Sequence, residues 1–415
     1  MRPLGLGPGL GWLLAIAASA ACAAVVPPLP SKGGPPWIEI QSAHFTLWTD
    51  APPQRARELM SELEHHYQVI VLAMNTAPTK RSFVIALRDS WEVAAFLPRT
   101  AVASAWEADE PTRQPAIVLS AATQNRDHVI SHELTHLISF GIIANQPHWL
   151  SEGIATYFEM AELDPGEVTV RIGVPRDDRA GYLHAFPPLP AAELFACRDH
   201  TCIDEAFYAT SWAVVSFLLN EHFDELAHYF QRLNALPRDR QGETWARAWS
   251  EAFPDLPPDK LDRELREWLV TGKVRLPLID VTVKDYPSTS RRLGDADALA
   301  VRSLLQLLFT HDVTAVRDQL AAAFTVDRTN VLARLVEAAL MQAIAPGDAR
   351  ATAAAHPGDW RAWWLVAFAA SQHTAAATAE RRAALTRMCA LTGDCGRAIA
   401  HRAPPPGAAA PSATP

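Results

Sequence analysis

The pattern of apolar and polar residues divides the chain into a mixed region and a helical region. Between residues 37 and 120, strand-like segments alternate with segments whose apolar residues recur at helical spacing. The strand-like segments are WIEIQSAHFTLWT, RSFVIALR and QPAIVLS, and the helix-like segments are PPQRARELMSELEHHYQVIVLAM and SWEVAAFL. From about Asn125, which can cap a helix, the pattern is helical almost throughout, with one short strand-like exception at EVTVRIG. We therefore expect an α+β fold with a small mixed sheet plus helices.

A second change of pattern divides the helical region. The composition shifts at residues 275–296, which are predicted to be a linker or a crossing segment. Residues 297–401 contain the short amphipathic segments ALAVRSLLQLLF, AVRDQLAAAF, NVLARLVEAALMQA and WRAWWLVAFAA. These predict an all-α domain of the helical-repeat type, and HPGDWRAWWLVAFAA is similar to a tetratricopeptide repeat, although no fixed period is present. Residues 402–415 are rich in proline and alanine and are expected to be a disordered tail.

Residues 1–26 have the layout of a signal or targeting segment. Arg2 precedes the apolar stretch LGWLLAIAASAACAAVV, which ends in small residues. Residues 27–36, PPLPSKGGPP, are predicted to be a linker. Lipidation of Cys22, simple cleavage and an uncleaved anchor stay open, because Ser19 stands where lipoprotein-processing sites carry a bulky residue. We expect an exported bacterial protein that is periplasmic, lipid-anchored or secreted, and that meets a membrane only through this segment.

Composition and charge narrow the classes of function. With 415 residues, of which 49% are hydrophobic, the chain is long enough for two domains with cores of their own. The formal net charge of −9 and the lack of a long basic run argue against nucleic acid as a partner. Beyond Cys22, the cysteines form two close pairs, Cys197 with Cys202 and Cys389 with Cys395. In an exported chain this spacing favours local disulfides over a zinc knuckle.

The segment VISHELTHLISF, residues 129–140, is the strongest chemical signal in the chain. His132 and His136 lie four residues apart, which places both imidazoles on one face of a helix. Two such imidazoles can bind one metal ion, while Glu133 projects toward a water on that ion. The motif is short, so a buried helix with hydrogen-bonded histidines is the alternative.

The segment PHWLSEGIATYFE completes a potential ligand set. Glu152 follows His136 by sixteen residues (152 − 136 = 16), which leaves room for a turn through residues 141–146 and a returning helix. Two histidines and one carboxylate leave a fourth position open for water, as catalytic zinc sites do. The sequence therefore predicts one catalytic Zn²⁺ held by His132, His136 and Glu152. The alternative, a surface charge at Glu152, would leave a carboxylate among apolar neighbours without a role.

HELTH followed by WLSEGIATYFE resembles the zinc-binding helices of the gluzincin metallopeptidases. The fuller similarity is to peptidase MA-like domains of bacterial exported proteins, which share the HFTLWTD opening, the strand before the metal helix and a later helix like FYATSWAVVSFLL. It covers roughly residues 37–272, and we assign the domain to residues 37–274.

This resemblance implies a zincin-like fold with zinc on His132, His136 and Glu152. It also implies that Glu133 is the general base that activates the zinc-bound water, and that Tyr208 stabilises the oxyanion. Tyr208 has an alternative role as a core aromatic residue.

Residues near the ligands are expected to orient the imidazoles. Thr156 and Glu159 lie one and two turns after Glu152, with Thr156 as the better candidate and helix packing as its alternative. His128 lies one turn before His132 and is expected to be solvated or to support the ligands without binding the metal. QPAIVLS matches the edge strand to which a substrate peptide adds in such enzymes.

These features predict an exported zinc metallopeptidase whose substrate is a peptide or protein. The chain has no Gly-x-Met-Glu-Asn segment, which anchors the free amine of the substrate in aminopeptidases, so an endopeptidase is favoured. The alternative is a non-catalytic binding or scaffold protein that recognises a protein partner through the C-terminal helices and keeps a vestigial zinc site. Glu133 argues against this alternative, because a scaffold does not need a general base.

Overall fold

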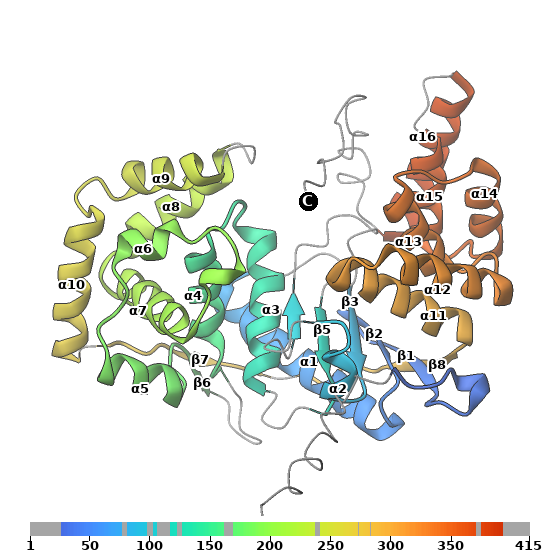
Figure 1. The fold of residues 1–415 in the computed structure, drawn as a ribbon. Coiled ribbons are helices and arrows are strands. Elements are labelled where there is room, and N and C mark those ends of the chain that lie inside the picture. Colours follow the sequence, from blue (N-terminus) through green and yellow to red (C-terminus); the bar gives the residue numbers. More distant parts are fainter. Residues whose placement is uncertain are drawn as a thin grey trace, which may run out of the picture.

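The protein is described here from a computed structural model, shown in Figure 1. It describes residues 26–76, 81–97, 103–105, 117–122, 127–161, 169–236, 241–272, 274–282, 284–370 and 375–392. The predicted targeting segment up to residue 25, the predicted helix cap Asn125, Cys395 and the predicted tail lie outside these residues. In the described part of the chain, none of the helices is long and apolar enough to cross a membrane.

Six strands form a mixed sheet in the order β4-β5-β3-β2-β1-β8. The neighbours β2, β3 and β5 are parallel, and the other pairs are antiparallel. A second, two-stranded sheet pairs β6 with β7. The strands are β1 (Trp37–Gln41), β2 (Phe45–Thr49), β3 (Ser82–Leu87), β4 (Ala103–Ala105), β5 (Ile117–Ser120), β6 (Thr169–Arg171), β7 (Leu278–Asp280) and β8 (Thr289–Leu293).

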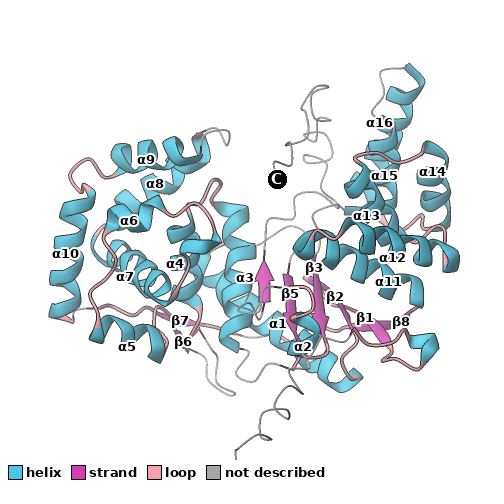
Figure 2. Cartoon of the chain, viewed as in Figure 1, coloured by secondary structure: helices cyan, strands magenta, loops and turns pink. Residues whose placement is uncertain are grey.

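Helices make up most of the remaining described chain, so the predicted α+β class with a small mixed sheet is confirmed (Figure 2). The helices are α1 (Pro53–Met74), α2 (Ser90–Val93), α3 (Asp127–Ile142), α4 (His148–Phe158), α5 (Asp177–Ala185), α6 (Ala191–Ala196), α7 (Glu205–Glu221), α8 (Phe223–Ala235), α9 (Gln241–Ala252), α10 (Pro258–Thr271), α11 (Asp295–Leu305), α12 (Val313–Val326), α13 (Val331–Met341), α14 (Pro346–Ala355), α15 (Trp360–Ala369) and α16 (Ala375–Thr392).

Successive strand residues point to opposite sides of the sheet, and the residues of its central strands are buried on both faces. Leu47 and Val84 face one core, which they share with α1, α3, α4 and α7. Trp48 and Ile85 face a second core, which is closed by α11, α12 and α13. A third apolar cluster joins α13 to α14, α15 and α16. The first core is the one that carries the predicted metal ligands.

The C-terminal helices therefore pack directly against the sheet, and residues 275–296 do not act as a linker that separates them from it. That segment contributes β7 and β8, and β8 pairs along its whole length with β1. The physical reason is the second face of the sheet, where Trp37, Trp48 and Phe83 need apolar cover. The helices α11–α13 supply that cover, so the sheet and the start of the predicted helical domain share one core.

Two further expectations differ from the structure. The predicted linker at residues 27–36 is docked, since Leu29 packs against the second core and the backbone N–H of Ser31 donates to Asp295 of α11 at 3.1 Å. The segment QPAIVLS is not an edge strand, because β4 pairs with the outer side of β5. On this side the edge of the sheet is β4, which also packs against α3.

One disulfide joins Cys197 to Cys202, as their spacing led us to expect. It closes the short connection between α6 and α7. Phe195, at the end of α6, lies 5.2 Å from the ring of Trp149 on α4, measured between ring centroids. The disulfide loop thus adjoins the aromatic packing beneath the helix that carries Glu152.

A pair of carboxyl groups is buried on the second-core side of the sheet. Asp50 follows β2 and accepts a hydrogen bond from the backbone N–H of Arg88 at 2.7 Å, and Glu92 of α2 lies close enough to share a proton with it. Burial raises the pKa of Asp50. Burial and the charge of Asp50 raise the pKa of Glu92 to about 8, although Arg302 of α11 opposes the shift.

This pair predicts a pH-dependent cost to stability that Glu92→Gln should remove. The folded state keeps a proton on Glu92 up to about pH 8, whereas the unfolded chain releases it near 4.5, so rising pH favours unfolding across this window. The free energy of unfolding of the variant relative to the wild type should rise between about pH 5 and about pH 8, by at most about 1.4 kcal/mol per pH unit.

Urea unfolding at several pH values measures this difference, with Glu193→Gln on the exposed face of α6 as the matched control. A difference between Glu92→Gln and wild type that does not vary with pH would contradict the assignment.

Candidate metal centre

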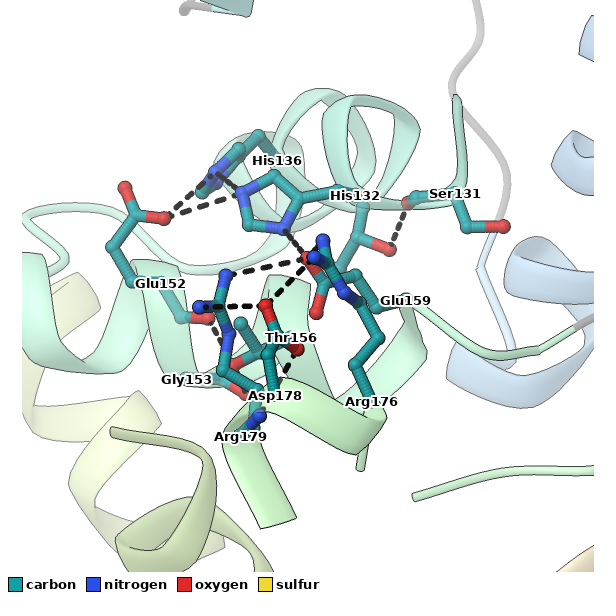
Figure 3. Close-up of polar contacts among 11 residues, drawn as sticks. Ser131, His132, His136, Glu152, Gly153, Thr156, Glu159, Arg176, Asp178 and Arg179 are labelled. Carbon is teal, nitrogen blue, oxygen red and sulfur yellow. Dashed lines mark hydrogen bonds and ion pairs between the residues drawn. The ribbon is translucent and has the colours of Figure 1, made fainter. Parts of the chain in front are cut away.

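Two helices bring the predicted ligands together. His132 and His136 lie on consecutive turns of α3, and Glu152 lies on α4, which packs against α3. The Nε2 atoms of the two histidines are 3.1 Å apart. Glu152 Oε2 lies 3.2 Å from His132 Nε2 and 3.5 Å from His136 Nε2, and Figure 3 shows the three side chains pointing toward one another.

The position of α4 depends on close packing on both of its sides. Its residues Trp149 and Leu150 are buried in the first core. Gly153, next to Glu152, faces α7, and a Cβ at this position would come within 2.6 Å of the backbone oxygen of Ser211. Only glycine allows this approach, so Gly153 fixes the distance between Glu152 and the helix that carries Tyr208.

The chemistry of the converging atoms fits a zinc ion. Among the described residues, one donor atom from each of His132, His136 and Glu152 lies within 4.8 Å of the others, and His128 is not part of this group. Glu152 Oε2 is buried and, in the part of the chain that the structure describes, has no hydrogen-bond partner despite its two imidazole neighbours. Two imidazole nitrogens and one carboxylate oxygen form the donor set of catalytic zinc sites.

Electrostatics at the three residues also favours a cation. Burial works against a charge on His132, but the carboxylates of Glu152 and Glu159 outweigh it and raise the pKa of His132 to about 10. Burial alone would raise the pKa of Glu152, yet the two imidazoles hold it well below its usual range. The carboxylates beside the two imidazoles thus favour a positive charge at this point, which is the charge that a metal cation would supply.

The far side of each imidazole has its own polar neighbour. His132 Nδ1 lies 3.4 Å from Glu159 Oε1, and His136 Nδ1 lies 3.0 Å from Ser151 Oγ. The hydroxyl of Thr156, the supporting residue that the sequence favoured, donates to the backbone oxygens of Glu152 and Gly153 in its own helix, which favours the helix-packing alternative. Ser151 was not anticipated, since a serine beside a ligand has no distinctive sequence signal.

The two residues predicted to act on the substrate lie at the same centre. Glu133 is buried, which raises the pKa of its carboxyl, while the charges of His132 and His136 lower it. Tyr208 lies on α7 with its ring 6.1 Å from the ring of His132. Burial, together with the charges of Glu152 and Glu133, raises the pKa of Tyr208, so its phenol keeps its proton and can donate a hydrogen bond.

Comparison with known proteins gives one family match. Residues 128–237 match a family described as "Protein of unknown function (DUF1570)". The matched segment begins just before the histidine motif and extends into the connection after α8, so it contains all three candidate ligands and Tyr208. No curated protein matches the chain.

The geometry predicts that Glu159 and Ser151 orient the imidazoles and that Thr156 does not. Glu159→Gln and Ser151→Ala should each weaken zinc binding by about 10- to 100-fold, as loss of such partners does at other metal sites. Thr156→Val, which removes only a hydroxyl bonded within its helix, is the matched control and should leave the zinc affinity nearly unchanged. Competition with a coloured chelator measures these affinities, and a larger loss for Thr156→Val than for Glu159→Gln would refute the assignment.

Proposed function

We propose that this protein is an exported zinc metallopeptidase of the gluzincin type, with a zincin-like domain that cleaves peptide bonds as an endopeptidase. The observation that carries the proposal is the convergence of His132, His136 and Glu152, with the Glu133 carboxyl buried beside them. A structural site would close the coordination with a fourth protein ligand, and the described residues supply three.

Zinc held by these three residues would supply a Lewis acid that polarises the scissile carbonyl and lowers the pKa of a water. Glu133 takes the proton from the attacking water and passes it to the leaving amine. Its burial supports this role, because a raised carboxyl pKa makes the group a better holder of the proton between the two steps.

Tyr208 acts on the other side of the reacting carbonyl. Its protonated phenol donates a hydrogen bond to the oxygen on which negative charge develops. The placement of its ring beside His132 supports this role over that of a core aromatic, since the side chain is only partly buried.

The sheet edge offers a binding mode for the substrate backbone. Among the described residues, β4 is the outermost strand on the side of α3, and an extended peptide could pair with its outer edge by strand addition. Such a mode accepts an internal stretch of a polypeptide, in line with an endopeptidase. A protein partner of the C-terminal helices would meet α14–α16 or the outer faces of α11–α13, because the inner faces of α11–α13 pack in the second core against the sheet.

The decisive experiment separates zinc binding from cleavage. Glu133→Gln should keep stoichiometric zinc and lower cleavage of a peptide library by about 10²- to 10⁴-fold, the usual contribution of a general base. Metal analysis and mass spectrometry of the digest measure the two quantities, with chelator removal and zinc addition as controls on the wild type. Absence of zinc overturns the proposal, and zinc binding without cleavage would favour the scaffold alternative.

A further inference from the structure

Helix α5 contacts the metal centre in an unusual way. No residue of the helix Asp177–Ala185 is fully buried, and its apolar residue Leu183 packs partly buried against the first core. Its first turn nevertheless places two arginines beside the metal ligands, Arg176 just before the helix and Arg179 within it (Figure 3). The Arg179 side chain is only 11% exposed, which is uncommon for an arginine of a surface helix.

Arg179 contacts two groups that belong to different parts of the candidate centre. Its guanidinium carbon lies 4.6 Å from the centroid of the Tyr208 ring, a cation–π arrangement. Its Nη2 atom lies 4.0 Å from Glu159 Oε1, and its Nε atom is buried and has no hydrogen-bond partner among the described residues. The same side chain therefore reaches the proposed oxyanion donor and the carboxylate behind His132.

Glu159 is held from two sides. His132 Nδ1 lies 3.4 Å from its carboxylate, and Arg176 Nη1 lies 3.5 Å from the same oxygen. Among the described residues, the Glu159 carboxylate forms ion pairs with His132, Arg176 and Arg179. The α5 arginines thus complete a continuous series of contacts from Tyr208 through Arg179 and Glu159 to His132.

The charges of this cluster balance, which argues against a site for an acidic substrate group. Arg176 and Arg179 both pair with Asp178, at 2.7 and 3.4 Å, and both face Glu159. Two cations meet two carboxylates, so no positive charge is left over for a ligand. This balance of charge indicates that the two arginines position other residues of the protein and do not bind a ligand.

We propose that Arg179 is a positioning residue that fixes the Tyr208 ring and the Glu159 carboxylate together, and so couples the oxyanion donor to the metal ligand His132. The Tyr208 half rests on the proposed peptidase function, whereas the Glu159 half requires only that the centre binds zinc. The planar guanidinium suits both contacts, because it stacks on a ring while its edge faces a carboxylate.

The first test measures zinc affinity and needs no turnover. Arg179→Gln should weaken zinc binding by about 3- to 10-fold, less than the loss expected for Glu159 itself. Arg179→Lys keeps a positive charge near Glu159 and should restore most of the affinity. Arg198→Gln is the matched control, because Arg198 also lies 4.6 Å over an aromatic ring, that of Trp245, and it should bind zinc like the wild type. Circular dichroism verifies that each variant is folded.

The second test measures the coupling between Arg179 and Tyr208 at saturating zinc. Arg179→Gln and Arg179→Lys should both lower kcat/KM by about tenfold, because neither stacks on the ring as a guanidinium does. In a Tyr208→Phe background the additional loss should fall below about twofold, since coupled residues are non-additive. Arg176→Gln should show additive effects with Tyr208→Phe, because Arg176 contacts Glu159 and Asp178.

Failure of the Arg179 proposal can be distinguished from failure of the proposed function. Wild-type zinc affinity in Arg179→Gln, or additive effects of Arg179→Gln and Tyr208→Phe, would overturn the proposal. If the wild type binds zinc but cleaves no peptide, the peptidase assignment fails. The affinity of the zinc-loaded variants for acetohydroxamate, measured by calorimetry, then replaces kcat/KM in the same cycle and decides the Tyr208 half.

Discussion

The burial of like charges at one point is the constraint on which the structure depends. Glu133, Glu152 and Glu159 come from two neighbouring helices, and burial opposes the charge of each. Only nearby positive charge offsets that cost, whether it comes from the histidines, the arginines of α5 or a bound cation. The packing of α3 between α1 and α4 keeps the carboxylates from separating into solvent. The positive charge that would complete the candidate ligand set therefore also stabilises this part of the fold.

Close packing fixes the distances between the residues of the candidate centre. Gly153 lets α4 approach α7, and this contact fixes Glu152 relative to Tyr208. The sheet gives α1 and α3 a rigid apolar surface, with Leu47 and Val84 in the shared core. On its opposite face the C-terminal helices bury Trp48 and Phe83. Residues that never approach the ligands thus determine the distances between them.

Local patterns predicted much of this arrangement, and contacts between distant segments were not predicted. His132 and His136 lie on one helix, so their spacing alone predicts that they are neighbours. The WLSEG segment follows after one short turn, so the sequence was enough to predict that Glu152 lies beside the histidines. Strand β8 was missed because four of its five residues are exposed and its partner β1 lies at the other end of the chain. Arg179 was missed for the same reason, since its segment has the polar composition of a surface helix and only tertiary packing places its side chain beside Tyr208.

The pairing of β8 with β1 affects the order in which the protein can fold. Residues 289–293 complete the sheet that residues 37–41 begin, so roughly 250 residues separate the two strands. During synthesis, the first strands emerge long before their last neighbour. Until β8 and α11–α13 arrive, the edge of β1 and the face around Trp37 stay uncovered. The three candidate ligands are thus synthesised well before the strand and helices that complete the sheet behind them, and the sheet is finished only after residue 293 has emerged.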